Sequence, residues 1–276
     1  MGLRISTNVA SINGHRNLSG SQMKLQDSMA KLASGSRINK ASDDAAGLAI
    51  SESFRGYIRS AQQADRNAND GISMIQTAEG GLNEIGNIIV RLRELGIQAS
   101  SDTIGDRERS FLNKEVEQLK SEADRIANTT TWGTTKLLDG SSPTFDFQIG
   151  IFNDELNDRI SFEASENVAT LDSLGIADID YTSQEGAQDA LTQLDEAQNR
   201  VNEQRSNLGA IQNRLISTSN NLGVFNENLS AANSRIRDAD VAKETAEMAK
   251  QNVLLQASTA TLAQANQQGA LAMQLL

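Results

Sequence analysis

The residues that could do chemistry in this chain are few and poorly placed for catalysis. Asp43 and Asp44 are adjacent carboxylates, and Asp238 and Asp240 form a similar pair. Such pairs could suggest a metal site or acid–base chemistry. However, adjacent residues on a helix point about 100° apart, and no His or third ligand stands near Asp43 and Asp44 in the sequence. We therefore interpret both pairs as helix caps and turn residues.

Other residues and motifs that catalytic or metal-binding sites use are also scarce. The chain has no Cys, which excludes disulfides and thiolate metal sites. Its one histidine, His15, is expected to be a partly buried polar residue at a helix seam. No phosphate loop and no nucleophile constellation is present. We expect no catalytic, metal-binding or cofactor-binding residue, no cofactor, and no enzymatic activity.

The most unusual segment is the C-terminal one, residues 251–276, which carries no charged side chain. It is rich in Ala, Leu and Gln, which are compatible with a helix, although a surface helix in water normally keeps a charged face. Its six Gln and two Asn make insertion into lipid costly. Two interpretations remain: a disordered Gln-rich tail, or a helix that is buried only after chains assemble. We favour the assembly helix and expect it to be unordered in the free monomer.

Composition narrows the class of protein further. The chain has 276 residues, a single Pro, 4% aromatic residues and a net charge of -11, which together suit long packed helices. Residues 1–40 hold six basic residues against one acidic residue. The acidic remainder argues against nucleic acid as a partner. No membrane-spanning stretch and no apolar signal-peptide core is visible, so we expect no membrane partner and a different export route.

Hydrophobic periodicity is strongest in the C-terminal half. An uninterrupted series at seven-residue spacing predicts a long helix with a coiled-coil-like seam. The phase breaks at 237–240, and a second series follows, which indicates a boundary between two packing environments. The first series is Leu194, Val201, Leu208, Leu215, Leu222, Leu229 and Ile236, and the second is Val241, Met248, Leu255 and Leu262.

The N-terminal half mirrors this pattern. Leucines mark a first helix up to about residue 33, turn residues interrupt it, and a second helix continues to about Ser100. A third helix follows around 112–126. Alternating segments at 145–149 and 159–163 predict a β-hairpin at about 143–164. Trp132, in the Thr-rich turn before it, is expected to anchor this region by packing.

The expected fold is therefore mainly α. It consists of long antiparallel helices in a coiled-coil-like bundle with a small β-hairpin region. The two terminal helices form a separate helical pair.

Two stretches of sequence carry a family resemblance. Residues 32–50, LASGSRINKASDDAAGLAI, resemble the N-terminal signature of bacterial flagellin. Residues 234–240, SRIRDAD, and the uncharged tail resemble its C-terminal signature. The resemblance implies a subunit that self-assembles into the helical flagellar filament used for motility, outside the cell. Because only about 50 residues separate the helical halves, this looks like a short, core-only form.

The resemblance also implies a domain arrangement. Residues 1–42 with 239–276 would form the inner core of the filament. Residues 43–180 with 181–238 would form the outer core, including the hairpin. Inner-core assembly would rest on Leu18, Leu25, Leu32, Val241, Met248, Leu255, Leu262 and Leu275, and outer-core packing on the series from Leu194 to Ile236.

Partners follow from the resemblance as well. They are other copies of the chain, the type III flagellar export machinery, an export chaperone, the filament cap and hook-associated proteins. The stretch around Arg91, Leu95 and Glu115 resembles the patch that the innate immune flagellin receptor recognises in some relatives. An exposed helical face that packs against neighbouring subunits explains the same residues.

Two alternative functions stay open at this point. One is the hook–filament junction protein of the same superfamily, which shares the terminal helices but should not form long filaments alone. The run Asp43 to Ile50 favours flagellin over it. The other is a secreted, host-interacting coiled-coil protein, for which a more apolar, membrane-active segment would be expected.

Overall fold

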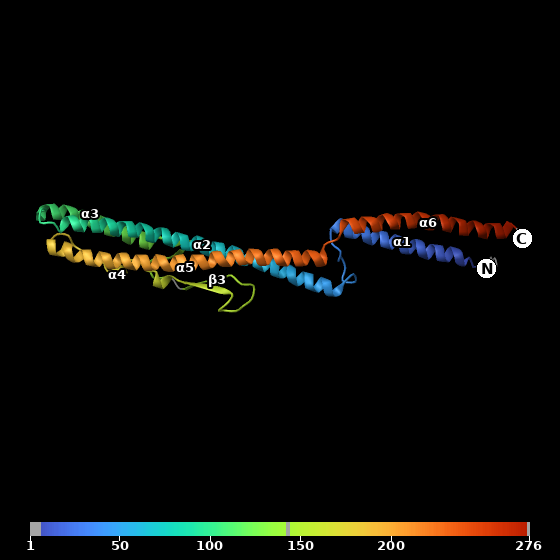
Figure 1. Cartoon of the computed structure of the whole chain (residues 1–276), viewed down its shortest axis with the longest axis horizontal. Coiled ribbons are helices and arrows are strands. Elements are labelled where there is room, and N and C mark those ends of the chain that lie inside the picture. The colour runs from blue at the N-terminus through green and yellow to red at the C-terminus, as the bar shows by residue number, and fades with distance from the viewer. Residues whose placement is uncertain (1–6, 142–143, 275–276) are drawn as a thin grey trace. The chain divides into compact units, whose positions relative to one another are not determined.

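The computed structural model describes residues 7–141 and 144–274, and they form mostly helix (Figure 1). The helices are α1 (Val9–Ser34), α2 (Ala45–Ala99), α3 (Asp106–Thr129), α4 (Leu171–Leu174), α5 (Gln184–Arg237) and α6 (Val241–Gln274), with a 3-10 turn, η1 (Ala164–Glu166). The strands are β1 (Thr131–Trp132), β2 (Thr135–Lys136), β3 (Thr144–Gln148) and β4 (Arg159–Glu163). The predicted mainly α fold is confirmed. Within the described ranges, no helix combines the length and the apolar character needed to cross a membrane.

The chain divides into two compact units. The terminal unit comprises Met1–Ile58 and Glu227–Leu276, and the central unit comprises Arg59–Asn226. The boundaries between the two units lie inside α2 and α5. From the sequence we predicted domain boundaries at 42/43 and 238/239. Within the terminal unit, Glu52 in the first turns of α2 forms an ion pair of 2.6 Å with Arg237 at the end of α5.

The terminal unit is a pair of helices, α1 and α6, that lie side by side as predicted (Figure 1). Asn8 begins α1, since its Oδ1 accepts a hydrogen bond from the backbone N–H of Ser11 at 3.0 Å. Gly35 ends α1 in the left-handed region at φ 69°, where a side chain would be strained.

The acidic pairs act mainly as caps, as the sequence predicted. Asp44 caps α2 by accepting from the N–H of Gly47 at 2.8 Å. Asp43 accepts from two N–H groups of the preceding turn, at 2.9 and 3.0 Å. Asp240 caps α6 by accepting from the N–H groups of its first turn. Among the described residues, no group of three potential metal ligands occurs.

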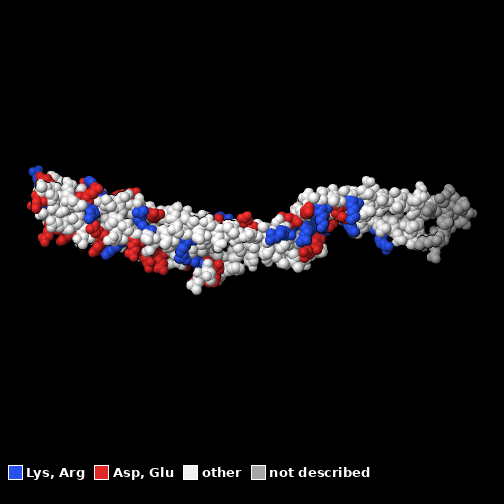
Figure 2. All heavy atoms as spheres, viewed as in Figure 1, with Lys and Arg blue, Asp and Glu red and all other residues white. Residues whose placement is uncertain are grey.

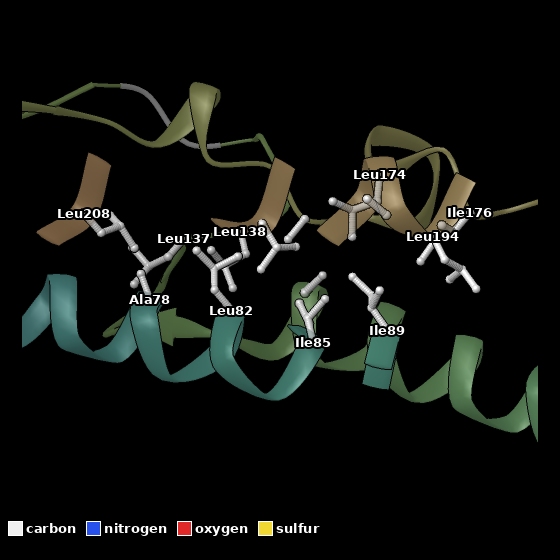
Figure 3. Close-up of a cluster of buried hydrophobic side chains, with 14 of the residues drawn as sticks. Ala78, Leu82, Ile85, Ile89, Leu137, Leu138, Leu174, Ile176, Leu194 and Leu208 are labelled. Carbon is white, nitrogen blue, oxygen red and sulfur yellow. The ribbon is translucent and has the colours of Figure 1, made fainter. Parts of the chain in front are cut away.

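The central unit is built around the facing sides of α2 and α5. Ala78, Leu82, Ile85 and Ile89 of α2 point toward Leu194 and Leu208 of α5 (Figure 3). The segment between α3 and α5 closes this core with Leu137, Leu138, Leu174 and Ile176, which are buried. Burial of these side chains, at about 25 cal/mol per Å² of apolar surface, drives folding of this unit.

The predicted hairpin is confirmed, and it lies against α2. β3 and β4 are antiparallel, with Phe145 opposite Phe162 and their rings stacked at 6.1 Å between centroids. Asn67 of α2 donates a hydrogen bond to the carbonyl of Gln148 at 2.9 Å.

A second ribbon, β1 with β2, was not predicted, because two-residue strands leave no alternation to detect. Trp132 in that ribbon is exposed, so its predicted role as a packing anchor is wrong.

Two adjacent glycines on α2 have opposite surroundings. A Cβ at Gly81 would lie 2.7 Å from Oγ1 of Thr130 and 2.8 Å from Cδ1 of Leu138, whereas one at Gly80 would meet nothing within 4 Å. We expect Gly80→Ala to stabilise the central unit by about 0.5–1 kcal/mol through helix propensity. We expect Gly81→Ala to destabilise it by about 1–3 kcal/mol through overpacking. Denaturant unfolding measures both, and equal stabilisation by the two changes would contradict the packing.

Candidate assembly surfaces

The contact between α1 and α6 follows a seven-residue repeat on both helices. The less exposed positions are spaced alternately by three and four residues, as in a coiled coil. On α1 they include Ser11, Gly14, Leu18, Ser21, Leu25, Ser28 and Leu32, and on α6 Glu244, Met248, Gln251, Leu255, Ser258, Leu262 and Ala265.

Small residues occupy four of these seven α1 positions, and they let the two helices approach closely. A Cβ at Gly14 would lie only 3.2 Å from Cδ1 of Leu262. Ser28 is 4% exposed and Gln251 is 2% exposed, so polar groups are buried in this contact. The sequence interpretation named the leucines and missed these partners. The Ser and Gly residues that recur between the leucines were the available signal.

The predicted inner-core residues are incompletely covered within one chain. Leu18, Leu25 and Leu32 are only half-buried, and so are Met248, Leu255 and Leu262. Val241 is 61% exposed. Leu275 lies outside the described residues. His15 is exposed, so the expectation that it is partly buried at the helix seam is wrong for the single chain.

The outer face of the terminal pair carries large apolar side chains in water. They are Val9, Ile12, Met23 and Met29 on α1, and Val241, Val253 and Leu254 on α6. No charged residue follows Lys250. In Figure 2, the coloured atoms thin out toward the free end of the pair, where the described surface is mostly white. Exposed apolar surface of this kind is typical of an interaction site.

The two units differ in charge. The terminal unit has eleven basic and nine acidic residues, a net charge of +2. The central unit has fourteen basic and twenty-seven acidic residues, a net charge of -13. The nearly neutral terminal unit can therefore meet other copies of itself without the strong like-charge repulsion that the central units would experience.

The carboxylates of Asp43 and Glu52, in the terminal unit, have lowered pKa values. Hydrogen bonds from the backbone N–H groups of Lys40 and Asn39 lower the pKa of Asp43. A hydrogen bond from Arg237, together with the charge of nearby Arg55, lowers the pKa of Glu52. Both groups favour the folded state in their ionised form.

These shifts predict an acid-sensitive terminal unit. A carboxylate with a lowered folded-state pKa stabilises the fold above its unfolded pKa, about 4, and this stability is lost as pH falls through the folded pKa. We expect Glu52→Gln to weaken the terminal unit at pH 7 and to flatten its pH dependence below about pH 4. Thermal unfolding followed by circular dichroism from pH 7 to pH 3 measures this. Identical pH profiles for both chains would contradict it.

The predicted outer-core seam on α5 is covered unevenly. Leu194, Val201, Leu208 and Leu215 are completely buried. Leu222, Leu229 and Ile236 are only half-buried, so the second part of the seam is open in the single chain. Gln204, also buried at a seam position, donates to the carbonyl of Val168 at 2.8 Å. The sequence interpretation missed it because a polar residue breaks the apolar pattern.

The predicted receptor patch is only partly on the surface. Arg91 and Glu115 are exposed and form an ion pair of 2.8 Å between α2 and α3. The hydrogen bonds that Arg91 donates to Glu115 and, to a lesser extent, to Glu94 raise the pKa of its guanidinium. Leu95 is 2% exposed and belongs to the hydrophobic core. Its prediction as a central surface contact is therefore corrected: Leu95 lies three residues after the buried Leu92, on the core side of α2.

Comparisons with known proteins point to one family. Residues 5–143 match the family model of the bacterial flagellin N-terminal helical region. Residues 191–276 match the model of the bacterial flagellin C-terminal helical region. The two matched regions hold α1, most of the central unit's helices, and α6.

Individual relatives agree over the full length. The chain is 47% identical to a flagellin of Halalkalibacterium halodurans, over 99% of both chains. It is 43% identical to a flagellin of Bacillus subtilis, over 99% of this chain and 100% of that protein. Among solved structures, the crystal structure of Bacillus cereus flagellin matches with a TM-score of 0.51 and 29% identity, covering 57% of this chain and 88% of that chain.

Proposed function

The chain belongs to the bacterial flagellin family and is a structural subunit of the flagellar filament, and we propose that its terminal unit makes the inner contacts of that polymer. In this proposal residues 1–42 with 239–276 form the inner core, and residues 43–180 with 181–238 form the outer core. The inner-core and outer-core seams named from the sequence carry the packing.

The observation that carries the proposal is the incomplete burial of α1 and α6. Their seam is half-buried and their outer face exposes large apolar side chains. A polymer would remove that surface from water, which is favourable by about 25 cal/mol per Å². Contacts that repeat head to tail without closing generate an open helical filament. Identity of 47% with a flagellin over nearly the whole chain favours the filament subunit over the junction and secreted coiled-coil alternatives.

The remaining partners belong to the same proposal. The filament lies outside the cell, and the chain reaches it through the type III flagellar export machinery with a chaperone. Filament cap and hook-associated proteins contact it at the filament ends. The absence of Cys and the single Pro are consistent with passage as an unfolded chain. The family is one of structural proteins, and we propose no catalytic role for this member.

Polymerisation of the purified chain tests the proposal. Monomer is concentrated by salting-out and viewed by negative-stain electron microscopy. We expect long tubes of uniform diameter. Soluble chains or amorphous precipitate under conditions that polymerise the Bacillus subtilis relative would argue for the junction protein, which does not extend alone.

We also propose that the surface carrying Arg91 and Glu115 is recognised by the innate immune flagellin receptor. Support comes from the exposure of both side chains and from their ion pair. Leu95 would act only by supporting the helix from beneath. Arg91→Ala should weaken receptor binding at least severalfold, whereas Arg93→Ala, which removes a similar exposed ion pair to Asp195 at 2.7 Å, serves as the matched control. Equal losses of receptor binding in Arg91→Ala and Arg93→Ala would contradict the proposal that the receptor contacts Arg91.

A further inference from the structure

Two linkers that lie about 200 residues apart in sequence meet in the terminal unit. One joins α1 to α2, and the other joins α5 to α6. The N–H of Arg37 donates to the carbonyl of Arg237 at 2.6 Å, and the N–H of Ala239 donates to the carbonyl of Gly35 at 2.9 Å. Ser36 and Asp238 lie opposite each other in an antiparallel bridge between these bonds. The linkers are thus joined as a minimal two-stranded ribbon.

The side chain of Arg37 reinforces this ribbon. Its Nε and Nη2 both donate to the carbonyl of Ile236, at 3.1 and 2.7 Å. That carbonyl lies in the last turn of α5, where it has no partner within the helix. A charged donor at this end also complements the negative pole of the helix. We call the two backbone bonds and the Arg37 guanidinium the linker clamp.

The opposite end of the α1–α6 pair has its own polar contacts. Asn8 Nδ2 donates to the carbonyl of Ala265 at 3.0 Å, and Ser11 Oγ donates to Asn266 Oδ1 at 2.9 Å. Between the two ends, the seam positions other than Glu244 and Gln251 hold small or apolar residues at regular spacing. Those positions specify axial register weakly, because a slide of one turn, about 5.4 Å, again places small or apolar residues face to face. Polar contacts at defined positions are what specify register in helix pairs.

We propose that Arg37 is a positioning residue whose clamp fixes the axial register of α1 against α6 in the assembled subunit. This inference deepens the proposed function, since register decides which apolar side chains each subunit presents to its neighbours. The clamp lies at the linkers, and none of its residues is among the large exposed apolar side chains of α1 and α6. Its loss should therefore alter the arrangement of the pair rather than remove the contact surface.

The chain has no Cys, so introduced cysteines report register cleanly. A Cβ at Gly14 would lie 3.7 Å from Cβ of Leu262, within the usual range for a disulfide. The pair Gly14→Cys with Leu262→Cys reports the native register. The pair Gly14→Cys with Ser258→Cys reports a slide of one turn. Each chain is incorporated as a minority into filaments of the unmodified chain, oxidised with diamide, and the intrachain disulfide is quantified by mass spectrometry.

In the native background we expect the native pair to crosslink and the shifted pair not to. With Arg37→Ala, the ratio of native to shifted crosslink should fall roughly three- to tenfold, the usual effect of losing a charged hydrogen bond at a partly exposed site. Arg37→Lys keeps the positive charge but loses the two-pronged guanidinium donor, so its crosslink ratio should lie between those of the unmodified background and Arg37→Ala. Arg235→Ala removes a neighbouring positive charge that makes none of the clamp's hydrogen bonds, so the crosslink ratio should stay unchanged.

An unchanged ratio in Arg37→Ala would overturn the proposal. If filaments exclude the Arg37→Ala chain but incorporate the Arg235→Ala chain, the proposal is supported. A subunit whose α1–α6 pair is shifted no longer fits the filament lattice. If the unmodified chain forms no filaments, the proposed function fails. If filaments form and Arg37→Ala leaves the crosslink ratio in them unchanged, only the register proposal fails, so the two ideas can fail separately.

Discussion

We expect a chain truncated after Lys250 to form no filaments while its central unit stays folded. The deletion removes the whole uncharged part of α6, including the seam residues Gln251, Leu255 and Leu262. The N-terminal half of α1 then loses the contacts of Asn8 with Ala265 and of Gly14 with Leu262. An unpaired amphipathic helix of this length is marginal in water. Without the pair, the apolar surface that neighbouring copies would bury is no longer assembled.

Sedimentation after salting-out measures the effect, and we expect no pelletable polymer from the truncated chain. Thermal unfolding of the central unit provides the control. It should be unchanged, because the hydrophobic cluster of that unit contains no residue beyond Leu215. Uniform filaments from the truncated chain would show that contacts outside residues 251–276 hold the polymer together.

The second large effect is expected in the core of the central unit. Leu82 is completely buried, and the close-up of the core shows it beside Leu137 and Leu138 (Figure 3). Leu82→Ala should destabilise the unit by about 2–5 kcal/mol, from lost burial and from the cavity left behind. Leu222→Ala, at a half-buried position of α5, should cost clearly less. Denaturant midpoints measure both, and a loss below about 1 kcal/mol for Leu82→Ala would contradict the packing.

The helices were predictable because their seams repeat over many turns. The leucines from Leu194 to Leu215 follow one heptad series, and the structure buries all of them. Where the series continues beyond Leu215, the side chains are only half-buried. A periodic pattern indicates which face of a helix is apolar, but it does not reveal whether that face is covered within the chain or by another copy.

The errors have physical causes as well. Leu95 was assigned to the surface by its place in a motif, although its three-residue spacing from Leu92 already indicated a core position. The small residues of α1 were passed over because Ser and Gly carry no hydrophobic signal, yet they allow the close approach to α6. His15 was expected near the seam, but it lies on the exposed side of α1.

The linker clamp could not have been predicted from the sequence. It depends on hydrogen bonds between backbone groups of 35–37 and 236–239, and such bonds leave no periodic trace. Arg37 lies within the flagellin-like N-terminal signature, but a resemblance does not say which carbonyl its guanidinium contacts. Only the folded arrangement brings the carbonyl of Ile236 within 2.7 Å of it.

Amide hydrogen exchange along α6 tests the central claim most directly, when the soluble chain is compared with the polymer. We predict that amides from 251 to 274 exchange quickly in the soluble chain, because the described leucines of the α1–α6 seam are only half-buried in a single chain, and that polymerisation protects these amides strongly. The buried part of the central unit should be protected in both states. Strong protection of 251 to 274 in the soluble chain, unchanged on polymerisation, would contradict an assembly helix.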